Sequence, residues 1–176
     1  MTIETLTKQN RTHTGLAGID TARLKAIRNA TLRACFNRME DTRNRMEFVA
    51  RILEREYIND AAARSVNATW YTLESLQGGL IWIVCGSYND TDYSRLVPVA
   101  LRKVRMMLVI GPDAQLRQAF AGSVPSIVSC TTMGEALHHA YMYESTDVKV
   151  VFSPACHDGT PTEALGDAFC REVNEL

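Results

Sequence analysis

Two clusters of reactive side chains invite a catalytic interpretation of this sequence. Cys156, His157 and Asp158 offer a nucleophile, a base and an acid in consecutive positions. Catalytic triads are assembled from distant segments, because adjacent side chains rarely converge on one another. The paired histidines His138 and His139 fall within a helical stretch, where neighbours face different directions. Neither cluster therefore predicts a catalytic centre or a metal site.

Asn59-Asp60 is a different kind of candidate, because it comes at the end of a predicted strand. A carboxylate there can accept hydrogen bonds from the hydroxyls of a sugar. The competing interpretation is a turn residue that caps the next helix, which is the commoner use of Asp in this setting. Taken alone, the residues favour the turn.

Composition excludes several classes of partner. The chain has 176 residues, 46% of them hydrophobic, which suits one domain with an appendage. The formal net charge of −1 gives no basic surface for nucleic acid or for an anionic membrane. The longest apolar stretch, Gly79–Gly86, is too short to span a bilayer, and we find no secretion signal. We therefore expect a cytoplasmic protein.

The cysteines and glycines exclude further kinds of site. The five cysteines form no CxxC pair and are odd in number, which argues against a zinc site and a disulfide framework. Neither the G-x-x-x-x-G-K-[ST] phosphate loop nor G-x-G-x-x-G occurs. The residues by themselves therefore predict no cofactor and no recognisable means of cradling a triphosphate.

Short apolar strands alternate with amphipathic helices from residue 56 onward. Strands are predicted at Glu56–Asn59, Leu80–Cys85, Met106–Ile110, Ser126–Ser129 and Val148–Phe152. Helices are predicted at Val66–Leu76, Tyr93–Lys103 and Ala114–Ala121, then after Thr132 and from about Thr162 to the end. This order is typical of an α/β fold: an open, mostly parallel Rossmann-like sheet with helices on both faces, preceded by an N-terminal helical segment at Asp20–Met39. Ligands of such sheets bind beyond the carboxyl ends of the strands.

Three polar residues are expected to begin these helices. Asp92 is placed to cap the helix Tyr93–Lys103, in which Pro98 is a local irregularity, and Asp113 is placed to cap Ala114–Ala121. Thr132 and Glu135 have the spacing of a capping box.

Several runs together resemble the carboxy-terminal domain of the Mur ligases, of the D-glutamate-adding type. Tyr57-Ile58-Asn59-Asp60 is similar to that family's Ile-Asn-Asp, and Ser153-Pro154-Ala155-Cys156 is similar to its Ser-Pro-Ala-Cys. Weaker matches lie at Asn44–Val49, Val66–Tyr71, Trp82–Gly86, Lys8–Asn10 and Leu16–Gly18. The resemblance implies a helical remnant of the ligase's central domain at residues 1–47 and a Mur-ligase-like carboxy-terminal domain at residues 48–176.

The resemblance also implies which positions could face a nucleotide. Arg45 and Asp60 match residues that contact the nucleotide at the family's domain hinge, Asp60 through the ribose hydroxyls. Asn10 matches a residue on the adenine side. The implied cofactor is ATP or ADP with magnesium. An alternative is structural, in which Arg45 pairs with Glu47 or Asp60 to hold the beginning of the domain.

The amino-acid positions of the family depart from its pattern. A lysine is replaced by Ala62 and a threonine by Arg64, although Arg64 restores one positive charge. Asn89 lies where the family carries a lysine-containing loop, and Asp158 replaces a serine. Losing a lysine and gaining an aspartate turns attraction for a dianionic D-glutamate into repulsion.

Three functions remain open at this stage. The first is a degenerate Mur-ligase-like protein, linked to peptidoglycan precursor synthesis, which binds or regulates without ligase activity of its own. The second is the amino-acid-binding part of an ATP-dependent ligase that works with a separate ATP-binding chain. The third is an unrelated small-molecule or protein-binding Rossmann-like module, for which Arg45 and Asp60 would not face one cleft. No nucleic-acid or membrane partner is expected, and self-association is left open.

Overall fold

The computed structural model describes residues 43–87, 90–157 and 159–176, which belong to one compact unit. Asn10, the expected helix Asp20–Met39, Asn89 and Asp158 lie outside the described residues. The division of the chain after residue 47 therefore stays a prediction.

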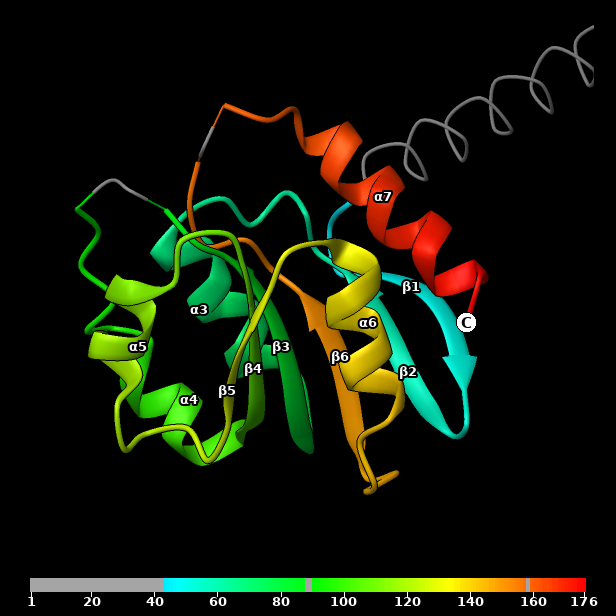
Figure 1. Ribbon diagram of the computed structural model, residues 1–176, viewed down its shortest axis with the longest axis horizontal. Coiled ribbons are helices and arrows are strands. Elements are labelled where there is room, and N and C mark those ends of the chain that lie inside the picture. The colour runs from blue at the N-terminus through cyan, green and yellow to red at the C-terminus, as the bar shows by residue number, and fades with distance from the viewer. Residues whose placement is uncertain (1–42, 88–89, 158) are drawn as a thin grey trace, which may run out of the picture. The chain divides into compact units, whose positions relative to one another are not determined.

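A six-stranded sheet forms the centre of this unit (Figure 1). In space the strands follow the order β1-β2-β6-β3-β4-β5. Only β1 runs antiparallel, to its neighbour β2, and the other described pairs are parallel. The strands are β1 (Glu47–Ile52), β2 (Arg55–Asn59), β3 (Gly79–Cys85), β4 (Val104–Ile110), β5 (Ile127–Cys130) and β6 (Val148–Phe152). The predicted α/β class and mostly parallel sheet are confirmed.

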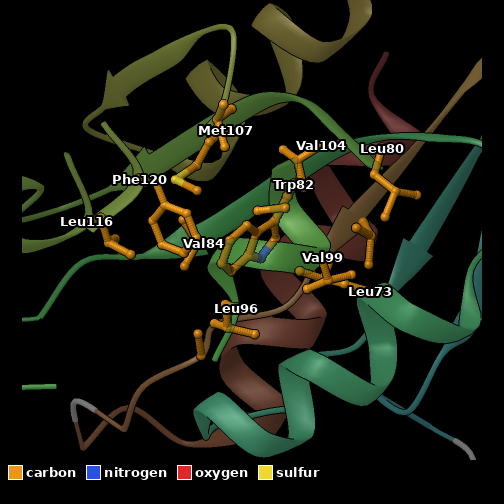
Figure 2. Packing of buried hydrophobic residues seen from close by; sticks show 14 of the residues in the cluster. Leu73, Leu80, Trp82, Val84, Leu96, Val99, Val104, Met107, Leu116 and Phe120 are labelled. Carbon is orange, nitrogen blue, oxygen red and sulfur yellow. The ribbon is translucent and has the colours of Figure 1, made fainter. Parts of the chain in front are cut away.

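Five described helices cover the two faces of the sheet. One hydrophobic cluster joins the sheet to α3 (Val66–Ser75), α4 (Val97–Lys103) and α5 (Ala114–Phe120). Figure 2 shows part of this cluster around Trp82. A second cluster joins the opposite face to α6 (Met133–Tyr141) and α7 (Thr162–Asn174). Layers on both faces leave the strand ends as the natural place for a site.

The central strand β3 explains why its sequence shows no polar alternation. Leu80, Trp82 and Val84 belong to the cluster under α3–α5, whereas Ile81, Ile83 and Cys85 belong to the cluster under α6 and α7. Successive side chains of a strand point to opposite faces, so a strand covered on both sides is apolar throughout.

The strand β1 was not predicted. It pairs with β2 through a turn at Leu53 and Glu54, whose φ angles are 48° and 64°. Hairpin turns with two positive φ angles normally carry Asn or Gly, so this sequence lacks the usual signal. Pairing with β2 stabilises the turn instead.

The three predicted helix caps differ in outcome: Asp92 is wrong, Asp113 is the N-cap residue of α5 but makes no side-chain cap bond, and Thr132 is confirmed. The helix expected from Tyr93 begins at Val97, because Asp92 Oδ1 accepts a hydrogen bond from the Ser94 N–H (2.9 Å) in a separate turn. Asp113 precedes α5, but its carboxylate binds Arg117 and Ser129 and makes no cap. Thr132 is confirmed, since its hydroxyl accepts from the Glu135 N–H (3.1 Å).

Within the part of the chain that the structure describes, no helix is long and apolar enough to cross a membrane.

Candidate functional site

A pocket of about 280 Å³ lies where β2 ends and α3 begins. We call it the Asp60 pocket. Its walls come from the segment before β1, from the loop after β2 and from α3. The lining residues are Arg45, Asp60, Ala62, Ala63, Ala68, Tyr71 and Thr72.

The carboxylate of Asp60 is almost completely buried, with 5% of the residue exposed. One oxygen accepts a hydrogen bond from the Met46 N–H (3.1 Å), and the other accepts from the Thr72 hydroxyl. Burial raises the pKa of Asp60, while the Thr72 hydroxyl, the Met46 N–H and the nearby Arg45 charge oppose that rise. Asp60 therefore connects the segment before β1 to α3, in addition to facing the pocket.

A buried polar network holds the segment before β1 in a strained conformation. Asn44 and Met46 both have positive φ angles, 61° and 48°. The Glu47 carboxylate accepts hydrogen bonds from the Asn44 N–H (3.0 Å) and from the Asn59 amide (3.0 Å). The Asn59 amide also donates to Asn44 Oδ1 (2.9 Å). These hydrogen bonds stabilise the segment in backbone conformations that would otherwise be unfavourable.

Arg45 projects from this segment as an exposed side chain of the Asp60 pocket. Among the residues that the structure describes, it forms no ion pair with Glu47 or Asp60. Both carboxylates are instead held by backbone N–H groups and by other side chains. The structural alternative, in which Arg45 pairs with Glu47 or Asp60, is therefore wrong, and Arg45 lines the pocket.

Comparison with known proteins gives one consistent result. No protein-family model matches. The chain is 32% identical over 175 residues to UDP-N-acetylmuramoylalanine–D-glutamate ligase of Porphyromonas gingivalis, covering 97% of this chain and 39% of the ligase. It is 35% identical over 136 residues to the ligase of the same name from Christiangramia forsetii, covering 77% of this chain and 31% of that ligase. The matched region is the carboxy-terminal one.

The chain belongs to the Mur ligase family. It spans less than half of the length of these relatives. A solved structure, the bifunctional folylpolyglutamate synthase/dihydrofolate synthase from Yersinia pestis complexed with AMPPNP and a Mn ion, shares the fold with a TM-score of 0.52. That match has 17% identity and covers 76% of this chain and 32% of the synthase. The family resemblance predicted from the sequence is confirmed.

Ala62, which the resemblance matches to a lysine of the family, lines the Asp60 pocket. Ala62 is half-buried, and its N–H donates to the Asn44 carbonyl (2.9 Å). Arg64 turns away toward the start of α7, where its guanidinium donates to the carbonyl of Thr160 and lies 3.5 Å from the Thr162 hydroxyl. Its positive charge is thus used to hold the loop before α7.

Cys156 and His157 do not form a catalytic pair. The Cys156 thiol is buried and donates to the Cys85 carbonyl (3.4 Å). The exposed His157 ring accepts from the Gly159 N–H (3.2 Å) through Nδ1. No group of three His, Cys, Asp or Glu side chains suited to a metal ion occurs among the described residues.

Three α3 residues of the Asp60 pocket were not predicted from the sequence. Ala68, Tyr71 and Thr72 all line the pocket. Their spacing of three and four residues places them on one side of a helix, which was the available signal. The missing information was which side of α3 faces the end of β2.

Proposed function

We propose that this region is a Mur-ligase-like carboxy-terminal domain that binds a nucleotide at the Asp60 pocket and does not by itself join D-glutamate to a substrate. In this proposal its role is binding or regulatory, and linked to peptidoglycan precursor synthesis. The observation that carries the proposal is that Arg45 and Asp60, fifteen residues apart, line one pocket. That arrangement argues against the unrelated Rossmann-like module.

The chemistry of the Asp60 pocket fits part of a nucleotide. The Arg45 guanidinium can bind an anionic phosphate, and the remaining lone pairs of Asp60 can accept from a hydroxyl. A volume of about 280 Å³ is at the lower limit of ordinary ligand pockets, which hold roughly 300–1,000 Å³. The rest of a nucleotide would lie against another surface. ATP or ADP would supply phosphate-transfer chemistry, and no step of it is assigned to this region.

The proposed lack of D-glutamate ligation is supported by the charges at the positions that the resemblance matches to the family's amino-acid site. Ala62 carries no charge, and Arg64 is bound to the loop before α7. A dianionic amino acid needs cationic or N–H partners in a partly dry pocket. Neither side chain is placed to supply them.

The proposal is tested by calorimetric titration with ADP and with ATP plus magnesium. Arg45→Ala is the informative variant, because Arg45 is exposed and outside the hydrogen-bond network, whereas Asp60→Ala would also break two structural bonds. We expect Arg45→Ala to weaken binding roughly tenfold, as for loss of one charge-assisted contact of about 1.5 kcal/mol. Arg105→Ala, an exposed arginine of β4, is the matched control and should bind normally. Equal affinity of the Arg45→Ala and unmutated proteins would contradict the proposal.

A second candidate is the amino-acid-binding part of a ligase completed by a separate ATP-binding chain. The small size of the Asp60 pocket favours it, because a pocket of this volume has room for only part of a nucleotide. In the same titration this candidate predicts tighter ADP binding once an ATP-binding Mur domain is added. Unchanged binding upon that addition favours the first candidate.

A further inference from the structure

An exposed aromatic ring forms one wall of the Asp60 pocket. Tyr71 is 66% exposed, although it lies in the middle of α3. An exposed ring is not unusual by itself, but one that lines a pocket offers a contact surface to a ligand.

The Tyr71 ring is supported from one side. It stands edge-on to the indole of Trp70, with ring centroids 5.0 Å apart and an interplanar angle of 77°. The Arg95 guanidinium covers that indole at 4.9 Å and is itself fixed by a hydrogen bond to Asn67 Oδ1 (2.7 Å). Edge-to-face contacts and stacked guanidinium groups reduce the freedom of the rings they touch. These contacts therefore restrict the rotation of the Tyr71 ring, although the ring is exposed to solvent.

Three of the residues that line the Asp60 pocket together with Tyr71 are small and apolar. Ala62, Ala63 and Ala68 contribute only methyl groups, and Ala62 stands where the family has a lysine. A lysine at that position would extend a long charged chain into the pocket. Alanine leaves space for a flat group between the methyl groups and the aromatic wall.

We propose that Tyr71 selects a planar aromatic ring, the base of a nucleotide, by stacking against it over the alanine side of the Asp60 pocket. Arg45 then faces the anionic part of the same ligand. This inference rests on the proposed function and adds the residue that determines its specificity. Stacking does not read the edges of a base, so the expected order follows ring area: purine above pyrimidine, and both above a ribose phosphate without a base.

The test compares AMP, CMP and ribose 5-phosphate, titrated separately into the full chain. Calorimetry gives the affinities, and tryptophan fluorescence gives a local signal, because the sequence contains two tryptophans and Trp82 is fully buried. Tyr71→Ala should weaken AMP binding about 5- to 100-fold, the range for loss of one stacked base, and bring AMP close to ribose 5-phosphate. Tyr71→Phe should retain AMP binding. Phe48→Ala removes an aromatic ring of similar exposure (60%) outside the pocket and should also retain it.

The outcomes separate this inference from the proposed function. If Arg45→Ala loses affinity for AMP while Tyr71→Ala does not, the nucleotide site stands and the role of Tyr71 is wrong. Loss of binding in Tyr71→Phe as large as in Tyr71→Ala would assign the effect to the hydroxyl and overturn stacking. If the unmutated chain binds none of the three ligands, both proposals fail.

Discussion

In the proposed nucleotide site, Asp60 would have two roles that impose opposite demands on its carboxylate. As a ligand-facing group it should be charged, but burial in the domain disfavours charge and raises its pKa. The hydrogen bonds from Thr72 and Met46 offset part of that cost. They also fix the carboxylate in place, which is what a binding residue requires. The same contacts that position Asp60 therefore make it part of the stability of the domain.

The raised pKa of Asp60 predicts how stability depends on pH. Between the ordinary pKa and the raised one, the folded protein holds a proton that the unfolded chain has lost, so the free energy of unfolding falls as pH rises through that interval. Asp60→Asn lacks this titration. We expect the unmutated protein to lose stability relative to Asp60→Asn as pH rises from about 3.8, and the difference to level off above the folded pKa. Urea unfolding of both proteins at a series of pH values measures this. A relative gain of the unmutated protein with rising pH would show that the folded pKa is lowered instead.

At the scale of elements, α7 is locked to the beginning of the domain through a close contact. A Cβ placed on Gly166 would lie 1.7 Å from Asn44 Oδ1 and 3.0 Å from the Asn59 amide nitrogen. Asn44 and Asn59 are the residues whose hydrogen bonds hold the segment that carries Arg45. Any side chain at position 166 must therefore separate α7 from the network beside the Asp60 pocket.

Two glycine-to-alanine changes in helices should have different effects. Gly166→Ala should cost more than about 2 kcal/mol of unfolding free energy, because buried amides must move. Gly134→Ala in α6 meets only the flexible end of the Glu172 side chain, at 2.7 Å. It gains up to about 1 kcal/mol of helix propensity, so its net effect should be small. Thermal and urea unfolding measure both. Equal stability of the two variants would show that α7 can shift at little cost.

At the scale of the whole molecule, one buried arginine joins segments that lie far apart in the sequence. Arg55 is 3% exposed at the start of β2. Its guanidinium donates to the carbonyls of Ala140 (2.9 Å), Tyr141 (2.7 Å) and Ser145 (3.2 Å), and to that of Tyr143. These carbonyls lie at and just after the end of α6, where helix C=O groups lack partners. The guanidinium of an arginine has five N–H donors and can serve all four carbonyls. The ammonium of a lysine has only three and cannot.

Arg55→Lys should therefore destabilise the protein despite keeping the charge. We expect a loss of about 3 kcal/mol, because one buried and three partly buried carbonyls share this guanidinium, which a lysine cannot replace at all four. Arg105→Lys, on an exposed side chain, should change stability by less than about 0.5 kcal/mol. The measurement is denaturant unfolding at a fixed pH. A neutral Arg55→Lys variant would show that lysine or water can satisfy the end of α6.

Local sequence patterns determined much of this protein. The alternation of apolar strands and amphipathic helices predicted the sheet and its two helical layers, because those periods reflect burial within each segment. The Thr132 cap of α6 was predictable for the same reason, since its partner Glu135 lies three residues away, although the Glu135 carboxylate accepts from the N–H of Thr131, where a full capping box uses the N–H of the cap residue itself. The motifs at the ends of β2 and β6 identified the family, because each is a run of consecutive residues that can be read without knowing the fold.

Contacts between distant segments decided the rest. The strand β1 exists because it pairs with β2 around a turn that lacks the usual residues. Arg64 points to the loop before α7, and Tyr71 points to the Asp60 pocket, because of where α7 and α3 pack. A side chain's direction depends on which neighbours the fold brings to it, and local periodicity does not contain that information.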